Sequence, residues 1–357
     1  MLALGAIAAL TTVLSSLLPA LLVGRVNPQA ALQAASRGVG SRSVGGKLSG
    51  ALVAAEVALS TLLLVGTGLL FHTLWNLGKA RLGFETANVT TFTAMPADAA
   101  GFSAMAVSED TANAPASVAT LTYQPVLERM RRVPGIESAA LITAPPLSGW
   151  DLNSDFKIVG QPDDPENPRS TRVTAVSGDC ARTFGTPVVR GRMINDDDVA
   201  SSPFVTVINE AFARKYFKGK DPLGMQIKLG GKDTGMLKPY TIVGVLGDQA
   251  DHNVGAEVQP FLMLPQQQVP TTSLFYQALL KTIVHFAVKT KGNVPVAAEM
   301  RSVFHEVAPS VALDEFQTMQ KAVDQNTFSQ RLGLYLVGSF ARNSWAIAAA
   351  RSGFAWR

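Results

Sequence analysis

The chain has 357 residues, of which 47% are hydrophobic and only 16% are charged, and its formal net charge is +4. Charged residues average about 25% of soluble domains, so this composition favours a chain that is partly inserted in a membrane. The basic residues are dispersed and are not interleaved with aromatic residues, which argues against nucleic-acid binding. The single cysteine, Cys180, excludes an intrachain disulfide and a multi-cysteine metal site, and we expect it to be a buried small hydrophobic residue.

The rest of the chain is arranged around an apolar segment, residues 51–71, with the sequence ALVAAEVALSTLLLVGTGLLF. A helix of this length spans roughly 30 Å, the thickness of the hydrocarbon core of a bilayer. We therefore predict a transmembrane helix within residues 51–75. Its only charged residue, Glu56, has two open interpretations: a functional carboxylate within the membrane, or a side chain that reaches the interface.

A second uncharged apolar segment opens the chain, and we predict a transmembrane helix over residues 1–24. A secretory signal peptide is the weaker alternative, because no basic residue precedes the apolar run. Residues 25–50 contain Arg25, Arg37, Arg42 and Lys47 but no acidic residue, so the positive-inside rule predicts a cytoplasmic linker.

Residues 76–330 are polar and mixed enough to form an extracytoplasmic domain. We predict two strand–helix–strand units in it, with strands at residues 88–94, 136–143, 283–290 and 311–316, helices at 124–132 and 296–307, and a loop at 98–115. In the third of these strands, alternation places Val284, Phe286 and Val288 on one face. Two such units on one sheet make a split ferredoxin-like layer, so the predicted fold class is an α+β extracytoplasmic domain carried on transmembrane α-helices.

Between the two units, residues 151–272 are predicted to form an inserted, mainly β subdomain with one helix. Its expected strands cover residues 205–208, 225–229, 240–246 and 261–264. The helix is expected at residues 210–217, with Asn209 as its N-cap and Gly219 at its end. After the domain, a polar helix over residues 320–330 leads into an apolar run that Arg342 interrupts. We predict an incomplete transmembrane helix and an aberrant tail over residues 331–357.

No motif in the chain predicts chemistry. There is no Walker A loop, and the glycines before Lys47 and Lys232 lack its spacing. The four histidines, His72, His252, His285 and His305, have no metal-ligand spacing, and no nucleophile elbow occurs. We therefore expect no catalytic, cofactor-binding or metal-binding residue, no cofactor and no enzyme activity.

Two acidic clusters could bind a divalent cation. They are Asp196-Asp197-Asp198, and Asp248 with Asp251. Neither has EF-hand spacing, so we favour solvated loop tips.

Several segments, taken together and in this order, resemble one known family. They are ALVAAEVALSTLLLVGTGLL (51–70), LERMRRVPGIESAALIT (127–143), TFGTPVVRGR (183–192), VTVINEAFARKYFKGKDPLG (205–224) and TIVGVLGDQ (241–249). The set resembles the permease subunits of MacB/FtsX-type ABC transporters with a MacB-like periplasmic core domain, and especially the duplicated permeases common in acidobacteria.

This resemblance implies a multi-pass protein of the cell inner membrane with its large domain in the periplasm. It implies a non-catalytic permease that couples a separate cytoplasmic ABC ATPase to movement of that domain, in a dimeric assembly within the lipid bilayer. The alternative function is a membrane-anchored extracytoplasmic binding or sensor module without transport. Family members continue past Phe340 with further apolar helices, so we expect this chain to be a fragment, ended by a frameshift or truncation near Ala341.

Overall fold

The computed structural model describes residues 81–96, 119–150, 152–162, 166, 168–230, 236, 238–281, 283–292, 294–328, 332 and 333, and the helical residues 58, 61, 62, 65, 66, 68, 69 and 72. The chain divides into two units, and residues 68–336 make up the unit that contains the folded domain. Residues 1–24, the linker 25–50, Glu56, most of residues 51–75, the loop 98–115 and nearly all of 331–357 lie outside the described residues. Within the described part, no helix is both long and apolar enough to cross a membrane.

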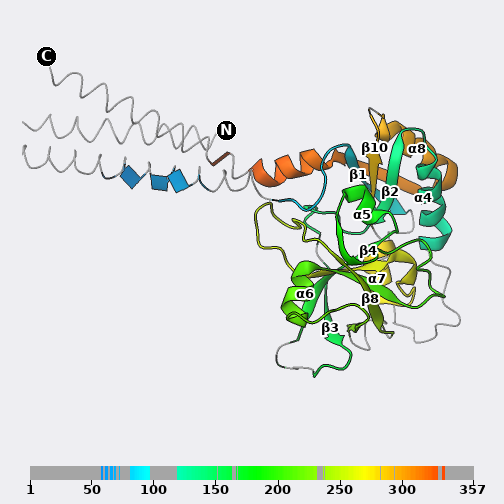
Figure 1. Ribbon diagram of the computed structural model, residues 1–357. Helices are drawn as coiled ribbons and strands as arrows, with labels where there is room; N and C mark the ends of the chain where they lie inside the picture. The colour runs from blue at the N-terminus through cyan, green and yellow to red at the C-terminus, as the bar shows by residue number, and fades with distance from the viewer. Residues whose placement is uncertain are drawn as a thin grey trace, which may run out of the picture. The chain divides into compact units, whose positions relative to one another are not determined.

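The first layer of the domain consists of four strands and two helices. These elements are β1 (Val89–Pro96), α4 (Gln124–Arg131), β2 (Ile136–Ile142), β10 (Val284–Thr290), α8 (Val296–Val307) and β11 (Val311–Thr318). Figure 1 shows where β1, β2, β10, α4 and α8 lie in this layer. The strand order is β11-β1-β10-β2, and each neighbouring pair is antiparallel. This is the order of a split ferredoxin-like layer, as the two strand–helix–strand patterns predicted. A five-residue π-helical turn, η2 (Ala119–Tyr123), leads into α4.

Successive side chains of each strand point to opposite faces of the sheet. Each face packs against one of the two core clusters of the domain. Val284, Phe286 and Val288 of β10 belong to one core cluster with α4 and α8, as the alternation predicted. Phe286 is stacked on Phe92 at a centroid distance of 5.7 Å and meets Phe304 of α8 edge-on at 5.2 Å. Burying each phenylalanine is worth roughly 1.5–3 kcal/mol, so this aromatic group is a main source of the layer's stability.

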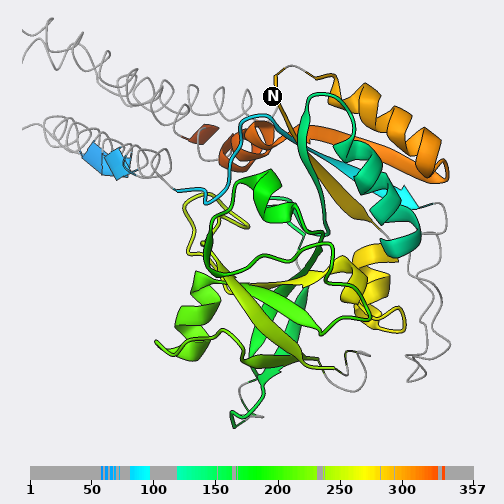
Figure 2. The ribbon, with the colours of Figure 1, turned by 45° about the vertical axis from the view of Figure 1, so that its right-hand side comes forward.

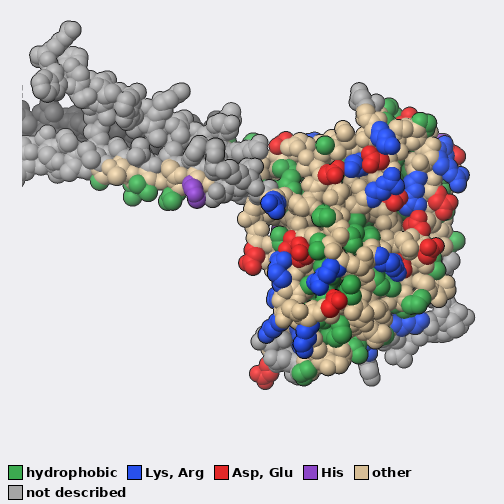
Figure 3. All heavy atoms as spheres, in the orientation of Figure 1, with side chains coloured by type: hydrophobic (Ala, Val, Ile, Leu, Met, Phe, Trp, Pro, Cys, Tyr) green, Lys and Arg blue, Asp and Glu red, His purple; other side chains and the backbone are tan. Residues whose placement is uncertain are grey.

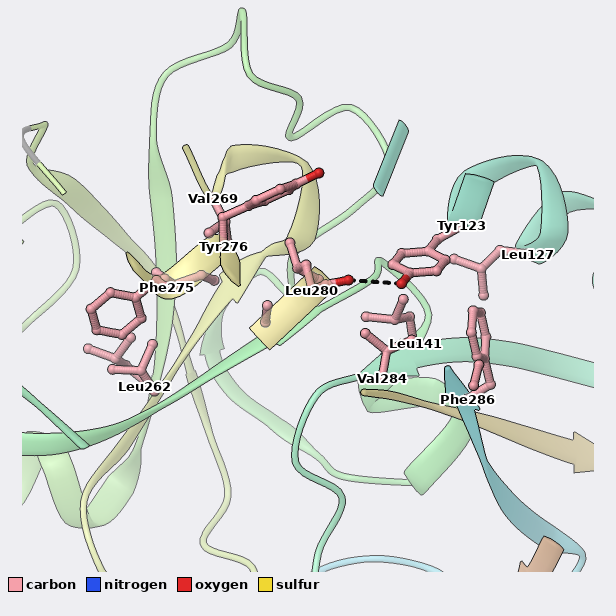
Figure 4. Packing of buried hydrophobic residues seen from close by; sticks show 14 of the residues in the cluster. Tyr123, Leu127, Leu141, Leu262, Val269, Phe275, Tyr276, Leu280, Val284 and Phe286 are labelled. Atoms are coloured by element: carbon pink, nitrogen blue, oxygen red, sulfur yellow. Dashed lines mark hydrogen bonds between the residues drawn. The ribbon is translucent and has the colours of Figure 1, made fainter. Parts of the chain in front are cut away.

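Tyr123 closes the same core at the start of α4. Figure 4 shows its hydroxyl donating a hydrogen bond to the carbonyl oxygen of Leu280, 2.8 Å away, beside Leu127, Val284 and Phe286. Both residues are fully buried, so this bond satisfies the one polar atom of the ring. Leu280 belongs to the π-helical turn η5 (Gln277–Lys281), which follows the short helix α7 (Leu274–Tyr276).

The opposite face of the sheet is covered by α5 (Cys180–Phe184) and by the helix at residues 319–328, which contribute to a second core cluster. Cys180 is buried in that cluster, as expected for a small hydrophobic residue. Burial raises the pKa of its thiol to about 12, so the sulfur stays protonated and unreactive at neutral pH.

The chain between β2 and β10 forms a closed ring of strands. The elements are β3 (Asn153–Ile158), β4 (Ser170–Val176), β5 (Val188–Gly191), β6 (Val205–Asn209), α6 (Glu210–Phe217), β7 (Gln226–Leu229), β8 (Tyr240–Leu246), β9 (Phe261–Pro265) and the 3₁₀ turn η4 (Gln266–Gln268). The sheet path runs β4-β3-β7-β8-β6-β9, and a parallel pairing of β9 with β4 closes it. β5 pairs with β8 outside this circuit. β4 also pairs with β2 of the first layer, at Val176 and Ile142, and this short antiparallel pairing joins the ring to the first layer.

The predicted strands β6, β7, β8 and β9 are present, and α6 covers Glu210–Phe217 as predicted. Asn209 caps α6, because its side-chain oxygen accepts a hydrogen bond from the Phe212 amide at 3.0 Å. The helix ends at Lys218, which takes the left-handed conformation one residue before the expected Gly219. The expectation of one helix was wrong, since α5 is a second one, and β3, β4 and β5 were not identified individually.

Candidate functional site

The residues that connect the parts of the domain meet at one loop. We call residues 247–254, which follow β8, the junction loop. The lead-in segment, residues 81–88, runs into β1, and the helix at residues 319–328 follows β11. The lead-in segment and this helix lie side by side in Figures 1 and 2, and Thr86 Oγ1 donates a hydrogen bond to Gln320 Oε1 at 3.0 Å.

The lead-in segment packs closely on the junction loop. The Ala250 amide donates a hydrogen bond to the Leu82 carbonyl oxygen at 2.7 Å. Gly83 has a φ of +73°, and a Cβ on it would lie 2.0 Å from the Asp248 carbonyl oxygen. Only glycine combines this backbone conformation with so close an approach. Backbone contacts therefore fix the two segments against each other.

The helix at residues 319–328, at the C-terminal end of the domain's sequence, also contacts the junction loop. Met319, Ala322 and Val323 are buried in the second core cluster. Asn326 Nδ2 donates a hydrogen bond to the His252 carbonyl oxygen at 2.8 Å, and its Oδ1 accepts one from the Val254 amide at 3.0 Å. One side-chain amide thus satisfies two backbone groups of the junction loop, and this holds the loop in register with the helix.

Asp248 connects the junction loop to the start of α6. Its Oδ1 accepts hydrogen bonds from the Ala211 amide at 2.8 Å and from Asn209 Nδ2 at 3.1 Å, while Oδ2 pairs with Arg214 at 2.5 Å. A carboxylate at a helix N-terminus is favoured by the free amides and by the helix dipole. Asp248 is therefore not a solvated loop residue, which corrects the sequence-based interpretation.

Asp251 connects the junction loop to the ring. Its carboxylate forms an ion pair with Arg172 of β4, and the two side chains are only 4% and 5% exposed. The guanidinium of Arg172 also lies over the aromatic side chain of Phe261, 5.9 Å from the centroid of its phenyl group. The Asp251 carbonyl oxygen accepts a hydrogen bond from the Leu147 amide at 2.7 Å. This second acidic residue was expected at a solvated loop tip and is instead buried and paired.

The other acidic cluster is also paired. Asp198 is buried and accepts two hydrogen bonds from Arg192, each of 2.7 Å, and one from the Asn195 amide at 2.9 Å. Asp196 pairs with Arg131 at 2.6 Å. Asp196 and Asp197 are both exposed, as the sequence predicted, and only Asp198 is buried. Among the residues that the structure describes, no group of three His, Cys, Asp or Glu side chains could hold a metal ion.

The histidines and glycines named from the sequence lie in separate elements. His285 of β10 is buried, and its Nδ1 lies 3.2 Å from the Thr143 carbonyl oxygen. His305 lies on α8, and the neighbouring Glu306 pairs with Arg129 of α4 at 3.0 Å. Gly230 forms a turn whose amide donates to the Asp155 carbonyl oxygen at 2.7 Å, whereas Lys47 and Lys232 lie outside the described residues.

Charges of both signs are interspersed over the face of the domain in Figure 3. That face offers no continuous basic surface of the kind that nucleic-acid binding requires. Sequence reasoning missed the residues that build the junction, Gly83, Arg172 and Asn326, because each depends on a partner far away in the chain. The one local signal was Asn209 ahead of α6, which we did predict.

Comparison with solved structures gives three similar chains. The periplasmic region of MacB from Actinobacillus actinomycetemcomitans is 15% identical, with a TM-score of 0.39, over 67% of this chain and 92% of that one. A domain of a putative permease from Porphyromonas gingivalis is 18% identical, with a TM-score of 0.38, over 66% and 92%. The extracellular domain of the noncanonic ABC-type transporter YknZ from Gram-positive bacteria is 15% identical, with a TM-score of 0.36, over 63% and 100%.

No curated protein matches the sequence. The family comparison is decisive because it covers more than half of the chain. The profile of the MacB-like periplasmic core domain matches residues 51–303, a range that includes the lead-in segment, both strand–helix–strand units up to α8, the ring and the junction loop. The chain belongs to the MacB-like periplasmic core domain family.

Proposed function

We propose that this chain is a non-catalytic permease subunit of an ABC-type export or mechanotransmission complex. A separate cytoplasmic ATPase would drive movement of its periplasmic domain. Family membership supports this proposal, and so does the way the domain is held at its two chain ends.

The proposal rests chiefly on one observation: Asn326 bonds the helix at residues 319–328 to the junction loop. In sequence, this helix leads into the predicted incomplete transmembrane segment at residues 331–357. The junction loop in turn holds β4 through Arg172 and α6 through Asp248. A displacement of the helix would therefore reach the ring through polar contacts that have defined directions.

The proposed organisation places transmembrane helices at residues 1–24 and 51–75, a cytoplasmic linker at 25–50 and the periplasmic domain at 76–330. The ring corresponds to the proposed inserted subdomain at residues 151–272. We place the protein in the inner membrane as a dimeric, multi-pass assembly with its ATPase. Catalysis has no part in this proposal, because the carboxylates around the junction loop serve ion pairs and a helix cap.

The first test is affinity purification of the tagged full chain from membranes, with identification of its partners. We expect an ABC ATPase to co-purify. A stable complex with a cell-wall enzyme that does not respond to nucleotide would instead favour the membrane-anchored binding or sensor module.

The second test concerns the coupling itself. In the purified complex we expect ATP to change hydrogen exchange of the junction loop, and we expect Asn326→Ala to abolish this change while ATP hydrolysis continues. Asn253→Ala removes an exposed amide from the same loop and serves as the matched control. If Asn326→Ala and the control respond to ATP alike, the helix does not transmit the movement through this contact.

A further inference from the structure

A small pocket lies over the sheet face opposite α4 and α8. Its volume is about 80 Å³, and its lining includes Thr91, Thr93, Ser148, Trp150, His285 and Glu315. Thr91, Thr93 and His285 form its buried floor, whereas Glu315 and Trp150 are exposed. The pocket therefore opens to solvent between these last two side chains.

The backbone is strained on both sides of this pocket. Glu315 has a φ of 54° within β11, and Leu147, in the loop that carries Ser148 and Trp150, has a φ of 62°. This left-handed conformation is rare and unfavourable for such residues, and it gathers at ligand sites, where the surroundings hold it in place.

The strain at Glu315 has a local cause. β11 has one extra residue between its pairings with Thr91 and Thr93 of β1, which is a β-bulge. The bulge lets Leu313 and Phe316 both pack on the core cluster beneath α8. It also turns Glu315 to the opposite face, where its Oε2 accepts a hydrogen bond from Thr93 Oγ1 at 3.1 Å.

The pocket presents hydrogen-bond acceptors and a negative charge. His285 Nδ1 donates to the Thr143 carbonyl oxygen at 3.2 Å, which leaves Nε2 with its lone pair as an acceptor. Burial lowers the pKa of His285, so this neutral form persists at pH 7.5. The hydroxyl protons of Thr93 and Thr91 are used in bonds to Glu315 Oε2 and to the Gln317 carbonyl oxygen. The exposed carboxylate of Glu315, which takes the Thr93 bond on Oε2, carries the negative charge of the pocket.

The ligand that complements these groups is a small cation with several N–H donors. A primary ammonium group has three donors, no acceptor and one positive charge. The half-exposed indole of Trp150 adds a ring face, which attracts such a cation. A cavity of about 150 Å³ holds benzene, so this pocket, about half as large, has room for roughly three non-hydrogen atoms.

We propose that this pocket binds a primary alkylammonium group, with Glu315 and His285 Nε2 accepting its N–H bonds and Trp150 covering it. The pocket touches two parts of the junction already described. Met319, the first residue of the helix at 319–328, lines it, and the loop with Trp150 is bonded to the junction loop through the Leu147 amide. An occupied pocket would therefore stabilise both connections, whether or not the chain takes part in transport.

The test uses the full chain in detergent micelles, with Trp75, Trp345 and Trp356 replaced by phenylalanine so that Trp150 is the only indole. Ethylammonium chloride is titrated against sodium chloride at constant ionic strength and pH 7.5. We expect a saturable change in Trp150 emission with ethylammonium only. Calorimetry on the unaltered chain measures the heat of ethylammonium binding and does not depend on fluorescence. If neither the fluorescence titration nor calorimetry detects binding, the proposal is overturned.

The variants test the chemistry. Glu315→Gln is expected to weaken ethylammonium binding at least tenfold, whereas Glu128→Gln, which removes an exposed carboxylate from α4, stays within twofold of the parent chain. Ethanol, which is uncharged, and tetramethylammonium, which is bulkier and has no N–H, are expected not to bind. Equal affinity of Glu315→Gln, or equal binding of either of these two probes, overturns the assignment.

Discussion

The substitution Asp251→Asn is expected to lower the free energy of unfolding of the domain strongly. The substitution keeps the shape of the side chain but leaves the Arg172 guanidinium buried without its charge partner, in a place where the two side chains are 5% and 4% exposed. Removing one partner of a buried ion pair costs about 3–5 kcal/mol, because the remaining charge has lost its hydration and its counter-charge. With a urea dependence of about 2 kcal/mol per M, the unfolding midpoint should fall by about 1.5–2.5 M.

The assay is urea unfolding of the full chain in detergent, followed by circular dichroism. Asp197→Asn is the matched control, because Asp197 is exposed on the other acidic loop, and its midpoint should not move. The double variant Arg172→Met/Asp251→Leu should recover most of the lost stability, since no charge stays buried. A loss below about 1 kcal/mol for Asp251→Asn would refute the reasoning. A double variant as unstable as the single one would assign the cost to packing.

Three further predictions concern single residues. His285 should make the domain less stable as the pH falls below 6.5, because burial lowers its pKa in the folded state despite the opposing charge of Glu315, so the unfolded chain binds the proton first. His285→Gln should flatten this part of the pH–stability curve, and an unchanged curve would contradict the assignment. Gly83→Ala should lower the melting temperature and raise hydrogen exchange at Ala250, because the new Cβ would clash with the junction loop. Asn209→Ala should cost about 1–3 kcal/mol in urea unfolding, since the amides of Phe212 and Phe261 each lose their acceptor, and a neutral effect would contradict the capping role.

Elements with strong local patterns could be predicted from the sequence. The alternation of β10 and the cap of α6 gave both elements nearly to the residue, since each signal lies within the element itself. β4 was harder to identify, because Arg172 is charged and charged residues are rarely buried without a partner. Its partner, Asp251, lies in a loop distant in sequence, so no local pattern could reveal that the pair is buried.

The same limit applied to the candidate site. In the sequence, Asn326 is one polar residue of a polar helix, and Gly83 is an ordinary turn residue. Their roles come from the carbonyl and amide groups of the junction loop, which only the folded chain brings within reach. The pocket beside Glu315 depends on a β-bulge, a one-residue shift between strands that side-chain alternation alone does not encode.

The order of strands in the ferredoxin-like layer has a consequence for synthesis of the chain. β1 pairs with β10 and β11 but with no strand close to it in sequence, and the whole ring lies in the chain between β1 and β10. The strands of the ring, in contrast, pair with each other, apart from the short pairing of β4 with β2. The ring can therefore fold before β10 and β11 are available to pair with β1. β1 and β2 would stay exposed during that interval, and a chaperone that covers strand edges would act at this stage.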